Sequence, residues 1–364
     1  MPTANRTWAD HATVSRDDIP GELIGRGHEG KYAMRKIVNA IPVRRKPGDI
    51  LEGAPMKPLA ADQVTGVWGT LLLPVEGRGD IVWDRLAGQL DVLLASGVDG
   101  IYAHGTAGEF HTLDEAEFDR VNAVLAGRCE AAGLPYQIGA SHPATPVMLD
   151  RIRRAAALRP GAVQVILPDW VPLSDDEVVR FLVGAAETAG DVPLVLYNPP
   201  HAKTQVPPPL LGRVAAEVPR LVGVKMAGGD AAWYAAMADA VPRLSIFVPG
   251  HLLASGLARG AHGSYSNVAA MSPRGAVAWY RLMTTDPAAA ADVERRVGEF
   301  FVRHVAPLRA RRLSNPALDK FLATVGDWAD IGVTLRWPAS SAPVDAVEPA
   351  RADAHRLLPE LFPA

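Results

Sequence analysis

Cysteine is almost absent from this sequence: Cys129 is the only one in 364 residues. A single thiol excludes an intrachain disulfide and a metal site built from cysteines. Cys129 lies in the helical stretch NAVLAGRCEAAG, where a small apolar side chain favours packing over reactivity. We therefore assign it to the core.

The chain also lacks a strong charge of either sign and a long hydrophobic run. Its 37 basic and 40 acidic residues leave a net charge of −3, which supplies no general field for nucleic acid or an anionic membrane. The first residues, MPTANRTWADHATVSRDD, have no apolar signal-peptide core, and no run is long enough to cross a bilayer. These absences predict a soluble, cytoplasmic protein without nucleic-acid or membrane partners.

Two nucleotide-binding signatures fail at their decisive positions. No GxGxxG sequence follows the first predicted strand, which argues against an open dinucleotide-binding sheet. The segment GRGHEGKY, residues 25–32, imitates a phosphate loop, but Tyr32 stands where Ser or Thr would hold magnesium. No strong strand precedes it either. We expect no cofactor.

From about residue 66 the sequence alternates short apolar runs with longer amphipathic stretches, the pattern of parallel strands joined by helices. The predicted strands are residues 66–74, 98–104, 135–141, 162–168, 193–199, 221–227, 244–250 and 261–267. The predicted helices are residues 82–96, 113–132, 145–158, 175–189, 208–217, 230–240 and 251–259, with Ser174 as a helix cap. Eight strands separated by helices predict a (β/α)8 TIM barrel of the α/β class.

Two different regions flank the barrel pattern. Residues 1–62 are weakly periodic, so we expect an extension that wraps the body or an interface, or is partly disordered. After the eighth strand, helical patterns continue at residues 272–311, 315–325 and 349–362. The predicted domains are an N-terminal extension (1–62), a barrel catalytic domain (63–290) and a C-terminal helical region (291–364).

In such a barrel, reactive groups lie where strands end and the following loops begin. Lys225 lies near the end of the sixth predicted strand, among small and apolar neighbours in GVKMAGGD. Burial disfavours the ammonium form and lowers its pKa, which makes a neutral amine available to attack a ketone. The position equally suits a lysine that pairs with a carboxylate or binds an anion, and position alone leaves both interpretations open.

Two further strand ends carry groups suited to catalysis or binding. Tyr197 ends the fifth predicted strand, where a phenol can relay a proton or bond a substrate oxygen, or can be only a packed ring. After the second strand, the turn GTAG offers successive backbone amides to an anion, and Thr106 adds a hydroxyl. A turn without a ligand is the alternative.

A metal site has little support in the sequence. His104, Glu109 and His111 have ligand chemistry, but a turn separates His104 from Glu109. No similar trio recurs at the other strand ends. We expect no metal ion.

Four segments together resemble the dihydrodipicolinate synthase/N-acetylneuraminate lyase family of Schiff-base class I aldolases. GTAGEFHTL is similar to the family's G-[ST]-[ST]-G-E motif, and LVLYNPP to its Y-N-x-P. LVGVKMAGGD is similar to the family's lysine segment, and GAHGSYSNVAAMSP to a shortened G-x-x-G-x-x-S-x-x-A-N-x-x-P region. The similarity runs from about residue 65 to 330, with the motifs in the family's order.

The resemblance implies a lyase in which Lys225 forms a Schiff base with a 2-oxo acid of the pyruvate type and Tyr197 shuttles protons. It also implies that the backbone amides of Thr106 and Ala107, with the Thr106 hydroxyl, hold the substrate carboxylate. We add Tyr265, from the fourth segment, as a substrate-binding residue. The family is commonly built as dimers of dimers, so we expect a homo-oligomer, either a dimer or a tetramer.

Three departures from the family pattern argue against dihydrodipicolinate synthase itself. Ala107 replaces the second hydroxyl residue, Trp170 replaces a Tyr of the lysine-biosynthesis branch, and only Lys203 matches the basic residue after Y-N-x-P. We predict an aldolase or dehydratase of unassigned substrate. Trp170 is expected to make the pocket larger and more apolar on its side, which suits a longer or aromatic acceptor. The alternative is a catalytically silent barrel that binds a keto acid as a sensor or partner protein.

Overall fold

The computed structural model describes residues 56–362 of the chain. The predictions for residues 1–55, including the phosphate-loop-like segment 25–32, lie outside the described residues. Across residues 56–362, every helix is too short or too polar to span a bilayer.

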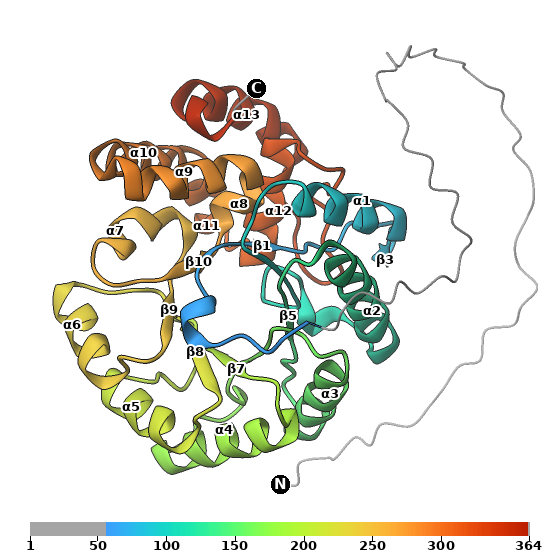
Figure 1. The fold of residues 1–364 in the computed structure, drawn as a ribbon. Coiled ribbons are helices and arrows are strands. Elements are labelled where there is room, and N and C mark those ends of the chain that lie inside the picture. Colours follow the sequence, from blue (N-terminus) through green and yellow to red (C-terminus); the bar gives the residue numbers. More distant parts are fainter. Residues whose placement is uncertain (1–55, 363–364) are drawn as a thin grey trace, which may run out of the picture. The chain divides into compact units, whose positions relative to one another are not determined.

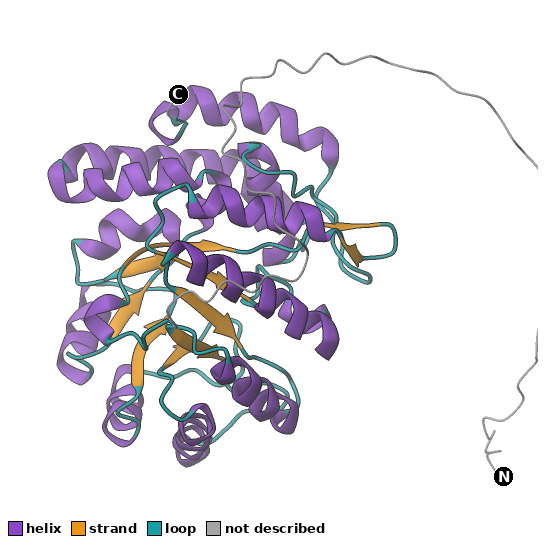
Figure 2. Ribbon diagram, turned by 45° about the vertical axis from the view of Figure 1, so that its right-hand side comes forward, coloured by secondary structure: helices purple, strands orange, loops and turns teal. Residues whose placement is uncertain are grey.

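Within the described residues, eight parallel strands close into a barrel that helices surround (Figure 1, Figure 2). The strands are β1 (Gly66–Thr70), β4 (Gly100–Ala103), β5 (Tyr136–Gly139), β6 (Ala162–Val165), β7 (Leu194–Tyr197), β8 (Leu221–Lys225), β9 (Ser245–Phe247) and β10 (Gly263–Tyr265). Each lies inside a predicted strand, and neighbours in the barrel follow chain order, with β10 closing on β1. The (β/α)8 prediction is confirmed.

The helices between the strands also agree with the predicted segments. They are α1 (Trp83–Leu94), α2 (Glu115–Ala132), α3 (Thr145–Ala157), α4 (Asp175–Ala189), α5 (Pro208–Glu217), α6 (Ala231–Ala240) and α7 (Leu253–Leu257). Ser174 caps α4 as predicted: its hydroxyl accepts from the backbone N–H of Glu177, whose carboxylate accepts in return from the Ser174 N–H. Cys129 is fully buried in α2, and burial raises its thiol pKa to about 12, so its core assignment is confirmed.

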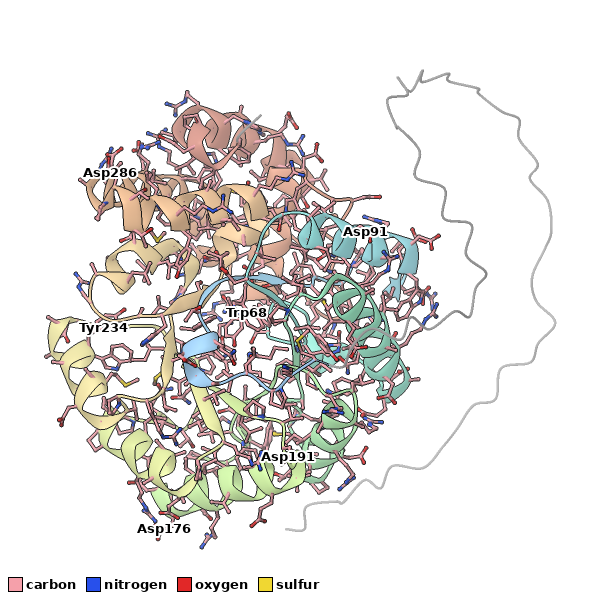
Figure 3. The ribbon with its side chains drawn as sticks, in the orientation of Figure 1. Trp68, Asp91, Asp176, Asp191, Tyr234 and Asp286 are labelled. Carbon is pink, nitrogen blue, oxygen red and sulfur yellow. The ribbon has the colours of Figure 1, made fainter. Side chains whose placement is uncertain are left out.

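Aromatic side chains fill the barrel below the strand ends. The rings of Tyr102 and Tyr265 lie 4.5 Å apart, and those of Phe247 and Tyr265 lie 4.7 Å apart, between centroids. Trp68 joins them at 5.9 Å from Tyr265, and Figure 3 shows it inside the ring of strands, whereas Asp176 lies at the periphery. These rings pack the interior of the barrel below its mouth, so the barrel has a filled core and no pore.

The helices that follow β10 gather on one side of the barrel, next to β1 (Figure 1). They are α8 (Asn267–Met271), α9 (Pro273–Thr285), α10 (Pro287–Phe300), α11 (Ala306–Ala310), α12 (Asn315–Gly326) and α13 (Val347–Leu357). The helical stretch predicted at 272–311 is interrupted at Asp286, which has φ −147° and accepts a hydrogen bond from the Ala289 N–H. Two elements were missed: α8, and a hairpin of β2 (Val75–Glu76) and β3 (Asp80–Ile81), both too short for a periodic signal.

Candidate active site

A cavity of about 340 Å³ lies where the barrel strands end. All five residues that the sequence predicted for the site line it: Lys225, Tyr197, Thr106, Ala107 and Tyr265. They come from separate strands and one turn, and only the closed parallel barrel brings them together. The carboxyl ends of the strands are where barrel enzymes place their chemistry.

Lys225 and Tyr197 lie side by side at the ends of β8 and β7. The strand register pairs the two residues directly, and Lys225 Nζ lies 4.3 Å from the centroid of the Tyr197 ring. The ring centroids of Tyr265 and Tyr102 lie 5.3 and 5.4 Å from the same nitrogen. Three aromatic rings therefore surround the amine.

Burial lowers the pKa of Lys225 from 10.5 to about 8. Desolvation of the ammonium is the main cause, and the carboxylate of Asp319 partly opposes it because a negative charge favours the charged amine. Burial raises the pKa of Asp319 to about 7, against the positive charges of Lys225 and Arg309. The direction of the Lys225 shift is the one expected from its apolar sequence neighbours.

The Tyr197 phenol is also buried, and desolvation raises its pKa. A hydrogen bond with the Thr106 side chain opposes this shift in part, since it favours the ionised phenol. A phenol with a raised pKa keeps its proton at neutral pH. It can therefore donate that proton to a neighbouring basic atom and recover it later.

The turn that carries Thr106 is fixed by close packing on both sides. A Cβ at Gly105 would lie 2.6 Å from a ring carbon of Tyr102, so the ring needs glycine there. The turn continues to Glu109, whose backbone is left-handed (φ 52°). The Glu109 carboxylate lies 2.5 Å from Nζ of Lys320 on α12, and neither side chain is more than 2% exposed. This buried ion pair ties the turn to the C-terminal helices.

The three residues considered as metal ligands do not converge. The ring of His104 lies 4.8 Å from the ring of Phe118, and burial lowers its pKa to about 3. Glu109 pairs with Lys320, and His111 lines a different cavity. Within residues 56–362, no group of three or more His, Cys, Asp or Glu residues is arranged to hold a metal ion.

A second cavity, of about 460 Å³, adjoins the first, and both are lined by Thr106 and Tyr197. Trp170 and Lys203 line this second cavity and not the first. Nζ of Lys203 donates to the backbone carbonyl of Trp170 at 2.8 Å and lies 4.9 Å from the centroid of its ring. Trp170 therefore lines the neighbouring cavity, which shares Thr106 and Tyr197 with the cavity around Lys225.

Sequence reasoning missed part of the cavity wall. Tyr102 lines it from β4, Arg309 from α11, and Asn315 and Asp319 from α12. The sequence does not distinguish Tyr102 as a site residue, because both faces of a buried barrel strand are apolar and an aromatic residue there is expected in the core. The segment ALDKFLATV did carry one: two adjacent charges, Asp319 among them, interrupt an apolar helix.

The Dihydrodipicolinate synthetase family matches residues 63–307, which is more than half of the chain. The chain belongs to this family. Membership places it among lyases and confirms the resemblance that four sequence motifs indicated.

Individual relatives agree with this placement. A 4-hydroxy-tetrahydrodipicolinate synthase from Porphyromonas gingivalis is 28% identical over 211 residues, 56% of this chain and 69% of that one. Other curated synthases are matched over 44% to 48% of their own length. The sialic acid aldolase structure from Ruminococcus gnavus has a TM-score of 0.72 at 16% identity, covering 82% of this chain and 99% of that one. The structure of a prophage protein of the dihydrodipicolinic acid synthase family from E. coli, solved in complex with pyruvate, has a TM-score of 0.71 at 19% identity. The match covers 81% of this chain and 98% of that one. The structural likenesses establish the shared fold.

Proposed function

We propose that the protein is a Schiff-base lyase acting on a 2-oxo acid of the pyruvate type, with Lys225 as the nucleophile. The observation that carries this proposal is the state of that amine. It lines a cavity at the barrel mouth among three tyrosine rings, and its pKa is about 8. At pH 7 about a tenth of such an amine is neutral, against well under a thousandth for an ordinary lysine.

The proposed reaction begins when the neutral nitrogen attacks the C2 carbonyl. The oxygen receives one proton from the attacking nitrogen and one from an acid and leaves as water, which gives a protonated imine. In aldol cleavage, a base takes the C4 hydroxyl proton and the C3–C4 bond breaks. Its electron pair moves to the imine nitrogen as an enamine while an aldehyde leaves. In dehydration, a base takes the C3 proton first, and the enamine then expels the C4 hydroxyl, which an acid protonates to water. In aldol cleavage, the enamine instead takes up a proton at C3 and becomes a protonated imine again. In both reactions water then adds to C2 of the protonated imine, the C2–N bond breaks, and the product leaves the regenerated amine.

Tyr197 is the proposed proton shuttle, because its phenol stays protonated and borders the amine. We place the substrate carboxylate on the backbone amides of Thr106 and Ala107, with the Thr106 hydroxyl as a further donor. Tyr265 contributes a ring face to substrate binding, since its hydroxyl already donates to Gln137 at 2.7 Å.

Methyl-proton exchange of pyruvate in D2O, followed by NMR, tests this function. Each cycle of imine and enamine replaces a methyl proton by deuterium, so the wild type should erase the methyl signal. Lys225→Ala should abolish the exchange, whereas Lys203→Ala, a lysine of the second cavity, serves as the matched control. Exchange at the wild-type rate in Lys225→Ala would refute the proposed nucleophile.

Borohydride reduction with a panel of 2-oxo acids, read by intact mass, then ranks the substrates. A wild-type protein that borohydride traps with pyruvate but that exchanges no methyl protons would support the silent keto-acid-binding barrel instead.

We also propose that the chain forms a homo-oligomer, as is common in the family. Trp170 and Trp337 support this, being 83% and 86% exposed, since exposed tryptophans are enriched at protein interfaces. Sedimentation velocity at micromolar concentration should find a dimer or tetramer, and a monomer would overturn the proposal.

A further inference from the structure

The cavity around Lys225 is lined from two parts of the chain. The barrel contributes the amine, the tyrosines and the Thr106 turn, whereas the C-terminal helices contribute a second set of residues. Phe301, Val305, Leu318 and Leu322 make that set partly apolar, and three polar side chains stand among them. These three are Arg309 on α11 and Asn315 and Asp319 on α12.

The three polar side chains are free to bind a ligand. Arg309 and Asn315 are exposed, and Asp319 is half-buried with the charges of Lys225 and Arg309 acting on it. Within residues 56–362, none of the side-chain hydrogen bonds or ion pairs involves Arg309, Asn315 or Asp319. Arg303, which precedes Arg309 on the same side of the barrel mouth, is by contrast paired with Glu299. Polar groups that line a cavity without partners are available to a ligand.

Helix α12 holds this part of the wall in a fixed position. Lys320, the residue after Asp319, is fully buried, and its Nζ lies 2.5 Å from Glu109 and donates to the carbonyl of Thr334 at 2.6 Å. Because Glu109 belongs to the turn that carries Thr106, α12 is anchored to the proposed carboxylate pocket. A site built on an anchored helix presents its groups with little loss of freedom on binding.

We propose that Arg309, Asn315 and Asp319 form the subsite for the part of the substrate beyond its 2-oxo acid, and that they select a hydroxylated chain with a terminal negative charge. The inference rests on the proposed function, because it needs the 2-oxo end of the substrate at Lys225. Arg309 supplies the cation for the terminal anion, as a guanidinium fork suits carboxylate and phosphate oxygens. Asn315 and Asp319 supply acceptors for hydroxyl groups, and the amide of Asn315 also donates.

An apolar or aromatic chain would fit this wall poorly. It could cover the leucines and Phe301, but it would also remove water from Arg309 and Asp319 without giving them new partners. Desolvating polar groups without compensation costs more than the apolar contact gains. The polar groups therefore decide the class of substrate.

Borohydride trapping with matched 2-oxo acids tests the subsite. The probes are pyruvate, 2-oxovalerate, 2-oxoglutarate and 2-oxo-3-deoxygluconate, and the readout is the concentration that gives half-maximal adduct. 2-Oxovalerate and 2-oxoglutarate have five carbons each and differ in the terminal carboxylate. Every value is divided by that for pyruvate in the same variant, which removes effects on Lys225 itself.

In the wild type, 2-oxoglutarate and 2-oxo-3-deoxygluconate should need about tenfold lower relative concentrations than 2-oxovalerate, the scale of one charge-assisted hydrogen bond. Arg309→Met should raise the half-maximal concentration of 2-oxoglutarate, relative to that of pyruvate, about tenfold. Asn315→Ala and Asp319→Asn should each raise the relative half-maximal concentration of 2-oxo-3-deoxygluconate by about the same factor. Arg311→Met, which makes the same charge change outside the cavity, should alter neither ratio.

Asp327→Asn is the matched control for Asp319→Asn. It makes the same charge change at the far end of α12, where the left-handed backbone (φ 53°) accepts asparagine. A wild type that prefers 2-oxovalerate, or subsite variants that leave every ratio unchanged while pyruvate is trapped, would overturn the subsite. Failure to trap pyruvate in the wild type would instead refute the proposed Schiff-base function.

Discussion

Asp319→Asn should shift the pH dependence of imine formation at Lys225 toward acid. The Lys225 pKa is about 8, lowered by burial and partly restored by the negative charge of Asp319. Removing that charge leaves desolvation unopposed, so the pKa of the amine must fall further. The neutral amine then becomes available at lower pH.

The magnitude follows from the fraction of neutral amine. In the wild type this fraction, and with it the rate of adduct formation, should rise about tenfold per pH unit below about pH 8 and level off above it. An ordinary lysine would level off only near pH 10.5. Because Asp319 itself titrates near pH 7, the wild-type profile should be broader than that of a single group. The profile of Asp319→Asn should be narrower, with a more acidic midpoint.

The assay measures initial rates of pyruvate adduct formation between pH 5.5 and about 10. Samples are quenched with borohydride and read by intact mass, at one pyruvate concentration well below saturation. Asp327→Asn is the control for a general change of charge. A wild-type midpoint near pH 10 would refute the argument from burial. A midpoint that rises in Asp319→Asn would refute the electrostatic contact between Asp319 and the amine.

Other substitutions test further parts of the site. Tyr197→Phe should keep the pyruvate adduct but lower kcat about 10²-fold, and an unchanged kcat would mean that protons travel by another route. Thr106→Val should cost about 1.5–3 kcal/mol, the scale of a hydrogen bond to a charged group, chiefly as a raised KM. Ala107→Thr should tighten pyruvate binding, and loss of every substrate would contradict the carboxylate pocket. Lys320→Met should lower the free energy of unfolding in urea by about 3–5 kcal/mol because it strands the Glu109 carboxylate. Addition of Glu109→Gln should recover part of that loss if the pair is the cause.

The barrel could be predicted from the sequence because each strand is a short apolar run between turn residues. The observed strands are shorter than the predicted ones at their C-terminal ends. There the chain leaves the sheet to form the site loops, as it does after Ala103 and after Lys225. Local pattern does not distinguish the last paired residue from the first loop residue. The sequence nevertheless predicts which site residues lie in these loops, because the order of the motifs along the chain assigns each motif to one strand end.

The remaining part of the site depends on long-range packing. Asp319 reaches the cavity only because α12 docks over the barrel mouth, and the pair of Lys320 and Glu109 spans more than two hundred residues of sequence. Helical periodicity predicts that α12 has an apolar face but not which surface covers it. The same limit applies to Trp170, because the sequence predicts its strand end but not which part of the mouth its side chain lines.

The central claim is that Lys225 carries the substrate as an imine. Its most direct test is a peptide map of the protein after borohydride reduction in the presence of pyruvate. Lys225 should carry a carboxyethyl group on Nζ, and the other lysines of residues 56–362, Lys57, Lys203 and Lys320, should stay unmodified. A carboxyethyl group on another lysine, with Lys225 unmodified, would contradict the account.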